Sequence, residues 1–267
     1  MNEQAFRLNG DAVMKRVVKV GGRAQSDPAL IGTIASAVEA GDSVCLVHGG
    51  GDEVSALQRR LGMEPKFIGG RRVTSEADLE IVRMVLSGTT NKRLVAQMVT
   101  AGIRAVGVSG EDAGMFRAEI VDPQMGRVGE RVAVDESLIE HLLSGGYVPI
   151  VSPLARDAAE PDGGRGLNVN GDDAAAALAV AVRADDLVFV ADVPGVLDGD
   201  VLIASLECAD AKKLIARGVI TGGMAAKLEA AEHAIRGGVK TVRIAGVAGI
   251  GDVTSGTRVL SSPLPVR

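Results

Sequence analysis

The sequence predicts an α/β fold with a mostly parallel central sheet, helices on both of its faces and a β-hairpin insertion. Short runs rich in β-branched residues alternate along the chain with segments of helical periodicity, which is typical of a parallel sheet. Clusters of glycine and polar residues follow these runs, where the carboxyl ends of parallel strands hold ligands. The clusters lie at 21–22, 49–51, 109–114, 152–172 and 192–195.

In the first half of the chain, Pro28 occupies a first helical position, and Ser75 with Asp78 forms the pattern of a capping box. The capping box predicts a helix to Leu86 that is separate from the next one. Strands are expected at 16–20, 44–47 and 103–108, helices at 28–39, 52–61, 75–86 and 91–100, and a loop or hairpin at 65–70.

In the second half, residues 116–134 alternate in polarity with turn residues between them, which predicts an antiparallel hairpin. Residues 157–166 are rich in Asp, Gly and Pro and predict a surface turn. An alanine-rich helix begins near Asp172, and its small side chains would pack closely on a sheet. Further helices are expected at 136–143, 209–217 and 224–236, and strands at 147–151, 187–191, 241–244 and 257–260.

Composition narrows the classes of function. The net charge is −5 and no basic run is present, so we expect neither a nucleic acid nor a membrane surface as partner. Trp is absent, and four Phe and one Tyr offer little surface for stacking on bases. We find no signal peptide and no apolar run of membrane-spanning length, so we expect a cytoplasmic protein with Cys45 and Cys208 as free buried thiols.

The segment Val47-His-Gly-Gly-Gly51 has the pattern of a strand, a glycine turn and a helix that opens at Asp52. Backbone N–H groups at such a turn can form a concave anion site, although a tight turn alone would also favour glycine. The segment is neither a P-loop nor a dinucleotide-binding fingerprint. His48 could order the turn, and Arg71-Arg72 is either a solvated pair or a grip on a carboxylate.

Two lysines and one acid lie beside the clusters. Lys19 precedes Gly21-Gly22, and Lys227 closely follows a glycine pair; an ammonium next to glycine suits a phosphoryl group. The alternatives are a solvated lysine on an edge strand for Lys19 and an ordinary helix-surface lysine for Lys227. Asp172 begins the alanine-rich helix, where capping alone would also explain an acid.

Taken in chain order, these motifs resemble those of the amino acid kinase family, and most closely the branch that acts on N-acetyl-L-glutamate. The resemblance spans nearly the whole chain. It is carried by Lys19-Val-Gly-Gly22, Val47-His-Gly-Gly-Gly51, Gly70-Arg-Arg-Val-Thr74, Asn91-Lys92, Asn168-Val-Asn-Gly-Asp172, Asp192-Val-Pro-Gly-Val-Leu197 and Gly218-Val-Ile-Thr-Gly-Gly-Met-Ala-Ala-Lys227.

The resemblance implies one domain over 1–267, a three-layer sandwich. Its N-lobe (1–165) would bind the acyl amino acid and dimerise, and its C-lobe (166–267) would bind the nucleotide. The implied reaction is ATP-dependent phosphorylation of the side-chain carboxylate of N-acetyl-L-glutamate to an acyl phosphate, in arginine biosynthesis. Mg²⁺ would bridge the β- and γ-phosphates.

The resemblance also implies roles for individual residues. Lys19 and Lys227 would stabilise the transferring phosphoryl group, and Asp172 would hold both lysines. Gly21 and Gly22 would donate N–H groups to the phosphates. The amino acid would be held by Gly50, Gly51, Arg72 and Asn168, with Arg72 on its α-carboxylate. The nucleotide site would be lined by Asp192, Val193, Pro194, Gly195, Val196, Leu197, Val219, Ile220 and Thr221.

Two positions depart from the pattern of the family. Gly171 stands where Ala often precedes the acid, and Asp173 stands where Gln or Thr often follows it. Together with Lys19-Val-Gly-Gly22, these two positions resemble kinases of lysine biosynthesis that act on carrier-protein-linked aminoadipate or glutamate. Gly70-Arg-Arg-Val-Thr74 and Ile220-Thr-Gly-Gly-Met224 instead favour the acetylglutamate branch. N-succinylglutamate is another possible substrate. A non-catalytic sensor of amino acid and nucleotide stays open as a different class.

A homodimer is also implied by the resemblance, and the apolar positions at 81–86 and 94–99 offer helix surface for it, unless they belong to the core. Arginine-inhibited members carry an added N-terminal helix. Because Gly10 disfavours a helix in the short segment before the first strand, we expect no such helix and no inhibition by arginine.

Overall fold

The computed structural model describes residues 13–160 and 164–262. The expectation about the N-terminal segment around Gly10 lies outside these residues. The middle of the turn expected at 157–166 also lies outside them.

An eight-stranded sheet forms the centre of the molecule, in the order β14-β16-β15-β11-β1-β2-β8-β5. Its neighbours are parallel except for β15 and β16. The strands are β1 (Lys15–Val20), β2 (Ser43–His48), β5 (Ala105–Ser109), β8 (Val148–Ser152), β11 (Asp186–Val190), β14 (Ser205–Glu207), β15 (Thr241–Ala245) and β16 (Thr257–Leu260). The mostly parallel sheet is therefore confirmed; β14 was not expected.

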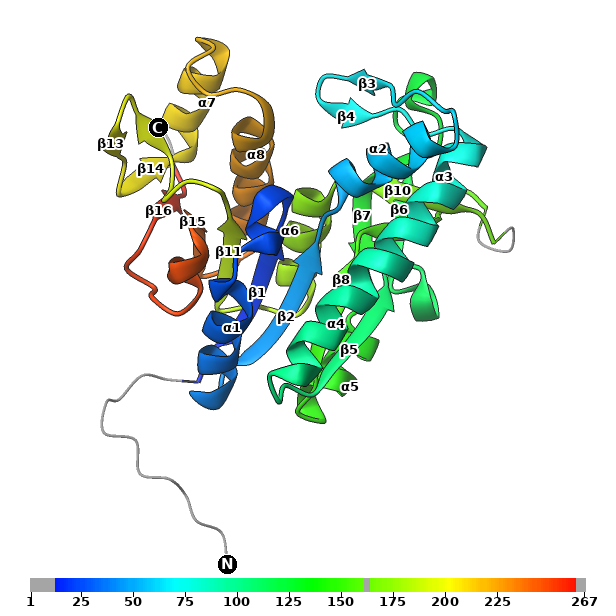
Figure 1. Cartoon of the computed structure of the whole chain (residues 1–267). Helices are drawn as coiled ribbons and strands as arrows, with labels where there is room; N and C mark the ends of the chain where they lie inside the picture. Colours follow the sequence, from blue (N-terminus) through cyan, green and yellow to red (C-terminus); the bar gives the residue numbers. More distant parts are fainter. Residues whose placement is uncertain (1–12, 161–163, 263–267) are drawn as a thin grey trace, which may run out of the picture.

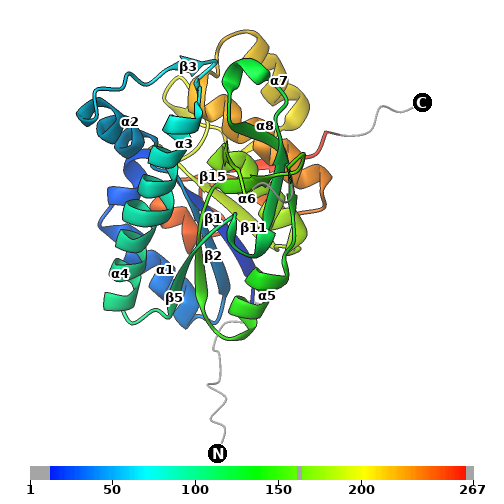
Figure 2. The ribbon, with the colours of Figure 1, turned by 90° about the vertical axis from the view of Figure 1, so that its right-hand side faces the viewer.

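Helices cover both faces of the sheet, so the three-layer arrangement is confirmed (Figure 2). One face packs against α1 (Ala29–Glu39), α4 (Asn91–Thr100) and the 3₁₀ turn η5 (Val247–Ile250). The other packs against α5 (Ser137–Ser144), α6 (Gly171–Ala181), α7 (Cys208–Ala216) and α8 (Gly222–Arg236). Ala174 to Ala177 of α6 are buried, as expected for a helix whose small side chains approach a sheet closely.

Side-chain alternation along β1 explains where its lysine points. Val18 and Val20 face the α1 layer, so Val17 and Lys19 face the α6 layer on the opposite side. Since β1 lies between β11 and β2, Lys19 is not on an edge strand. The solvated alternative for this lysine is thus wrong.

The helix expected to end at Leu86 continues instead. α3 (Glu76–Arg83), the π-helical segment η2 (Met84–Thr90) and α4 follow one another with helical backbone at the junction residues. The expected gap between Leu86 and Asn91 is thus filled by the π-helical segment, and the two helices form one continuous helical run. The capping box of Ser75 and Asp78 is present as expected.

The hairpin expected at 116–134 forms as β6 (Phe116–Glu119) and β7 (Val128–Val134), but it is only half of a closed four-stranded barrel. β9 (Leu154–Asp157) and β10 (Gly166–Val169) complete the barrel. The ends of the expected 157–166 turn therefore belong to strands. Two small hairpins also form, β3 (Phe67–Ile68) with β4 (Arg71–Arg72), and β12 (Leu197–Asp198) with β13 (Val201–Leu202).

Figure 1 shows two halves on either side of β1. α2 (Gly51–Arg60), α3, the barrel and the β3–β4 hairpin lie in one half, and α7, α8 and β11 to β16 lie in the other. Within the described residues no helix is long and apolar enough to cross a membrane. Both cysteines are free and buried, as expected.

Candidate active site

Lys19, Asp172 and Lys227 come together at the carboxyl end of β1. The Lys19 ammonium lies 2.9 Å from Asp172 Oδ1, and Lys227 donates to Asp172 Oδ2 at 3.5 Å. The three side chains are 8, 7 and 14% exposed, respectively. Burial lowers the pKa of Lys227, the charge of Lys19 lowers it further, and Asp172 opposes both. Asp172 thus holds two like charges close together.

The glycines around this cluster leave room for the lysine. A Cβ at Gly21 would lie 2.6 Å from Lys19 Nζ, and one at Gly171 would lie 3.2 Å from Lys19 Cε. Asn170 caps α6 by accepting from the N–H of Asp172 at 2.7 Å. Glycine backbone without side chains therefore lies next to a buried ammonium, an arrangement suited to an anion.

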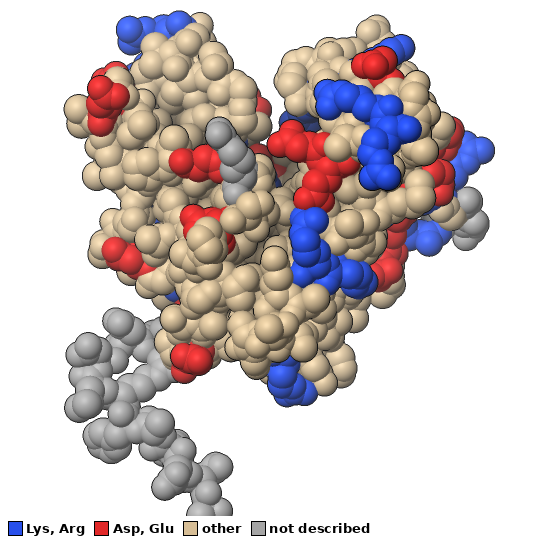
Figure 3. Space-filling view, viewed as in Figure 1, with Lys and Arg blue, Asp and Glu red and all other residues tan. Residues whose placement is uncertain are grey.

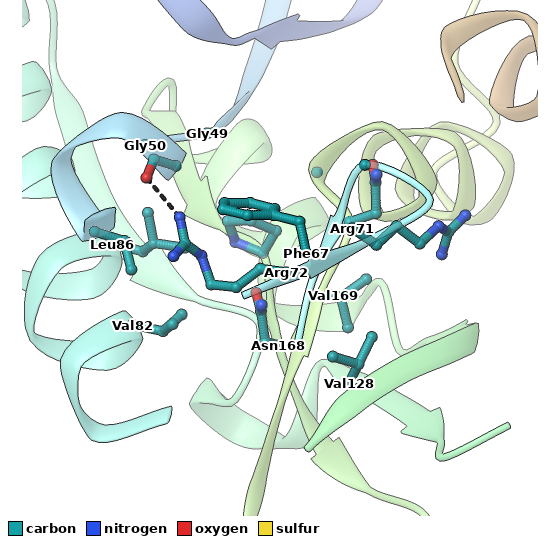
Figure 4. A pocket seen from close by; sticks show the side chains of 16 residues that line it. Gly49, Gly50, Phe67, Arg71, Arg72, Val82, Leu86, Val128, Asn168 and Val169 are labelled. Atoms are coloured by element: carbon teal, nitrogen blue, oxygen red, sulfur yellow. Dashed lines mark hydrogen bonds between the residues drawn. The ribbon is translucent and has the colours of Figure 1, made fainter. Parts of the chain in front are cut away.

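A pocket of about 200 Å³ lies beside the cluster. Gly171 and the glycine turn after β2 form its wall toward Lys19. The residues that line it include all four expected to bind the amino acid, namely Gly50, Gly51, Arg72 and Asn168. Figure 4 shows Arg72 and Phe67 side by side on one flank, with Val128 and Val169 on another.

Arg72 is buried, and helix α2 fixes its guanidinium. It donates to the carbonyl of Gly51 and the hydroxyl of Ser55, both at 2.7 Å, and also to Gln58 Oε1. Its guanidinium carbon lies 4.8 Å from the centre of the Phe67 ring. All three acceptors are neutral, and the ion pairs among the described residues do not include Arg72. A buried cation held this way suits a carboxylate ligand.

His48 and the π-helical segment shape the glycine turn. His48 is fully buried, donates from Nδ1 to the Gly49 carbonyl at 2.8 Å and accepts at Nε2 from Asn91 at 3.2 Å. Burial lowers its pKa to about 4, so the imidazole is neutral at pH 7. A Cβ at Gly50, where φ is +156°, would lie 2.6 Å from Leu86 Cδ2. The turn therefore needs glycine for both conformation and space.

A second hollow lies across the cluster, over the carboxyl ends of β1, β11 and β15. Three residues of the expected nucleotide segment line it, Asp192, Val193 and Pro194. Gly22 lies close to the Asp192 carboxylate, which also acts on the charge of Lys227. The cluster thus lies between the two hollows, which it meets through Gly171 on one side and Asp192 on the other. Figure 3 shows a furrow between the two halves of the molecule.

The other residues expected at the nucleotide are divided between surface and core. Leu197 is partly exposed, and Val219 and Thr221 are exposed. Gly195, Val196 and Ile220 are buried; the Val196 N–H donates to Thr257 Oγ1 at 2.7 Å, and both apolar side chains belong to the core. These three residues support the loops from beneath.

Several residues at the site are absent from the sequence expectations. Asn170, Phe67 and Pro153 line the first pocket. The position of Asn170 directly before an acidic first turn was the one available signal, because Asn is favoured at helix N-caps. Pro153 lies at the start of the cluster expected at 152–172, and nothing local in the sequence marks Phe67.

Comparisons with known proteins agree with this geometry. The amino acid kinase family model matches residues 14–246. The acetylglutamate kinase of Chloroflexus aurantiacus is 43% identical over 246 residues, which cover 91% of this chain and 95% of the relative. The acetylglutamate kinase of Methanopyrus kandleri is 42% identical over 245 residues, covering 88% and 96%.

Solved structures share the fold. The protein smu.665 of Streptococcus mutans has a TM-score of 0.81 and 28% identity, covering 91% of this chain and 97% of that one. The N-acetylglutamate synthase of Neisseria gonorrhoeae, in complex with coenzyme A and N-acetyl-glutamate, has a TM-score of 0.78 and 23% identity. This match covers 94% of the present chain and 60% of the synthase.

Proposed function

This chain belongs to the amino acid kinase family, and from that premise we propose that it transfers the γ-phosphoryl group of ATP to the side-chain carboxylate of N-acetyl-L-glutamate. The product is an acyl phosphate, and the reaction is the acetylglutamate kinase step of arginine biosynthesis. The observation that carries the proposal is the Lys19–Asp172–Lys227 cluster between two hollows.

The chemistry requires no general base. A carboxylate is already ionised at pH 7, so its oxygen attacks the γ-phosphorus directly. The new O–P bond forms as the bond from the γ-phosphorus to the β,γ-bridging oxygen breaks, and ADP leaves with that electron pair. The main obstacle is repulsion between anions, which Lys19 and Lys227 offset while Asp172 keeps them in place.

We assign the first pocket to the amino acid. Arg72 would bind the α-carboxylate, and Asn168 and the N–H groups of Gly50 and Gly51 would fix the rest of the ligand. This places the side-chain carboxylate toward Lys19, because Gly171 joins the pocket wall to that lysine. With this assignment most of the acyl amino acid site belongs to the N-lobe, and residues 168–171 at the start of the C-lobe complete it.

We assign the second hollow and the segments 192–197 and 219–221 to ATP, with the N–H groups of Gly21 and Gly22 on its phosphates. Mg²⁺ would neutralise part of the phosphate charge. The described residues hold no group of three or more His, Cys, Asp or Glu that could cage a metal ion. That donor set fits a metal carried mainly by the nucleotide phosphates.

We also propose a homodimer formed by the N-lobe. β5 is an edge strand of the sheet, and Met84 and Val99 are each 55% exposed on the adjoining helical run. An unpaired strand edge beside apolar helix surface is a site where a second copy can pair. Light scattering at micromolar concentration tests this, and a monomer would end the idea. Because ATP is a substrate, we expect a cytoplasmic enzyme.

An assay of ADP release tests the proposed substrate. N-acetyl-L-glutamate, N-succinyl-L-glutamate, L-glutamate and L-aspartate are compared side by side with ATP and Mg²⁺. We expect the highest kcat/KM with N-acetyl-L-glutamate. Ligand binding without ADP release from any of them would favour a sensor, and turnover only with a carrier-linked glutamate would favour the carrier-dependent kinases.

A further inference from the structure

One cation and two acids meet at the rim of the amino acid pocket. Arg71 Nη2 lies 3.2 Å from Asp173 Oδ2, and Arg71 Nη1 lies 3.4 Å from Glu130 Oε1. The three residues come from β4, α6 and β7. We call them the rim cluster. Its formal charge is −1, because both carboxylates share a single guanidinium.

The rim cluster is next to the apolar wall of the pocket. Arg71 lines the pocket, and its guanidinium points away from that of its neighbour Arg72 (Figure 4). Val128 also lines the pocket, and Glu130 is two residues further along β7 and therefore on the same face of that strand. The cluster thus extends the Val128 wall toward solvent.

The position of the acyl group follows from the two ends already assigned, so this step rests on the proposed function. With one carboxylate at Lys19 and the other on Arg72, the amino acid's nitrogen substituent must take the remaining wall. That wall is made by Val128, Val169 and Arg71.

We propose that the rim cluster sets the acyl specificity of the enzyme: it admits short neutral acyl groups and rejects those that end in a carboxylate. Among the described residues that line this wall, Arg71 is the one cation, and it is already shared by Asp173 and Glu130. An acyl group with its own terminal carboxylate would meet a surplus negative charge without a free partner. Placing a ligand carboxylate next to a negative charge, with no cation free to pair with it, is an effective way to exclude that ligand.

The test compares two acyl groups that match in size and differ in charge. N-succinyl-L-glutamate ends in a carboxylate, whereas N-succinamoyl-L-glutamate ends in a neutral amide. We expect the wild-type enzyme to use the succinamoyl compound with a kcat/KM at least about tenfold higher, a difference of about 1.4 kcal/mol. N-acetyl-L-glutamate serves as the reference substrate.

Variants then assign the discrimination to the cluster. In the Glu130→Gln/Asp173→Asn double variant Arg71 becomes free to pair with the succinyl carboxylate, so the ratio should fall to about one or invert. In Arg71→Met both acids lose their partner, so the ratio should rise. If the rim cluster were merely structural, the variants would lower kcat/KM for all three substrates by the same factor. The ratio of succinamoyl to succinyl kcat/KM would then stay unchanged.

Equal use of the succinyl and succinamoyl compounds by the wild type would overturn the proposal, and so would an unchanged ratio in a folded double variant. If the double variant does not fold, Glu130→Gln alone must shift the ratio in the same direction by a smaller amount. Absence of turnover with all three compounds would instead contradict the proposed function.

Discussion

Replacing Asp172 by Asn removes the negative charge that holds Lys19 and Lys227 together while keeping the shape of the side chain. At 2.9 and 3.5 Å and an effective dielectric constant near 20, the two Coulomb attractions amount to about 6 and about 5 kcal/mol. Desolvation of the three groups offsets much of this. Removing one partner of a buried ion pair typically costs about 3–5 kcal/mol.

We expect two consequences of Asp172→Asn. First, kcat should fall by about 10²–10³, the scale for losing one preorganised charge-stabilising group. Second, the pKa of Lys227 should fall further, because burial and Lys19 already lower it and Asp172 is the group that opposes them. Since the protonated lysine is the active form, the alkaline limb of the pH profile of kcat should move to lower pH.

Asp186 provides a matched control. It is also a buried acid between two cations, with Arg16 at 2.9 Å and Arg243 at 2.7 Å, but it begins β11 and so lies at the opposite end of the sheet from the lysines. Asp186→Asn should lower the free energy of unfolding by a similar amount, measured by urea denaturation. At a temperature where the variant is folded, its kcat should stay within about threefold of the wild type. This change corresponds to a smaller free energy than the loss of a single hydrogen bond to a charged group.

Steady-state ADP release across pH 6–10, with both substrates saturating, measures both effects. The assigned role of Asp172 is contradicted if Asp172→Asn keeps most of its kcat, or if the alkaline limb of its pH profile does not move. It is also refuted if Asp186→Asn loses as much kcat as Asp172→Asn, because the loss would then reflect stability alone.

Three further predictions concern the amino acid pocket and the glycine turn beside it. Arg72→Lys should raise KM for N-acetyl-L-glutamate about tenfold or more and leave KM for ATP nearly unchanged, because lysine cannot reproduce the planar fork held by Gly51 and Ser55; equal losses for both substrates would make Arg72 structural. Gly50→Ala should lower the free energy of unfolding, measured by urea denaturation, by about 1–3 kcal/mol more than Gly62→Ala does. Both glycines have positive φ, but only at position 50 would the alanine Cβ crowd Leu86. Stability should fall as pH drops from about 6.5 to about 4, because unfolded His48 takes up a proton that the folded protein excludes; His48→Asn should flatten this slope, and an unchanged slope would contradict the assigned pKa.

Local sequence patterns predicted the features that depend on neighbouring residues. The strand at β1, the capping box of Ser75 and the alanine-rich helix all follow from spacing and residue type. Lys19 was indicated as a site residue by the glycine pair that follows it, because an ammonium next to glycine suits a phosphoryl group. The partner, Asp172, stood out only because it begins a helix beside glycine.

The features that the sequence did not predict depend on contacts between distant segments. β9 and β10 are too short to be distinguished from loops, and only pairing with β6 and β7 makes them strands. The helix was expected to end at Leu86, and nothing local indicated that it continues through the π-helical segment, where Leu86 and Thr90 lie against Gly50 of the glycine turn. Arg71 and Arg72 looked equivalent, yet strand alternation directs one to the rim cluster and the other to α2.

Trapping the product shows which group accepts the phosphoryl group. An acyl phosphate reacts with hydroxylamine to give a hydroxamate, so N-acetyl-L-glutamate, ATP, Mg²⁺ and the enzyme are incubated with hydroxylamine, and hydroxamate and ADP are both quantified. We predict that the two form in equal amounts, and that Lys19→Ala and Lys227→Ala lower both together. ADP formed without hydroxamate would show that water, and not the side-chain carboxylate, accepts the phosphoryl group, which would contradict the account.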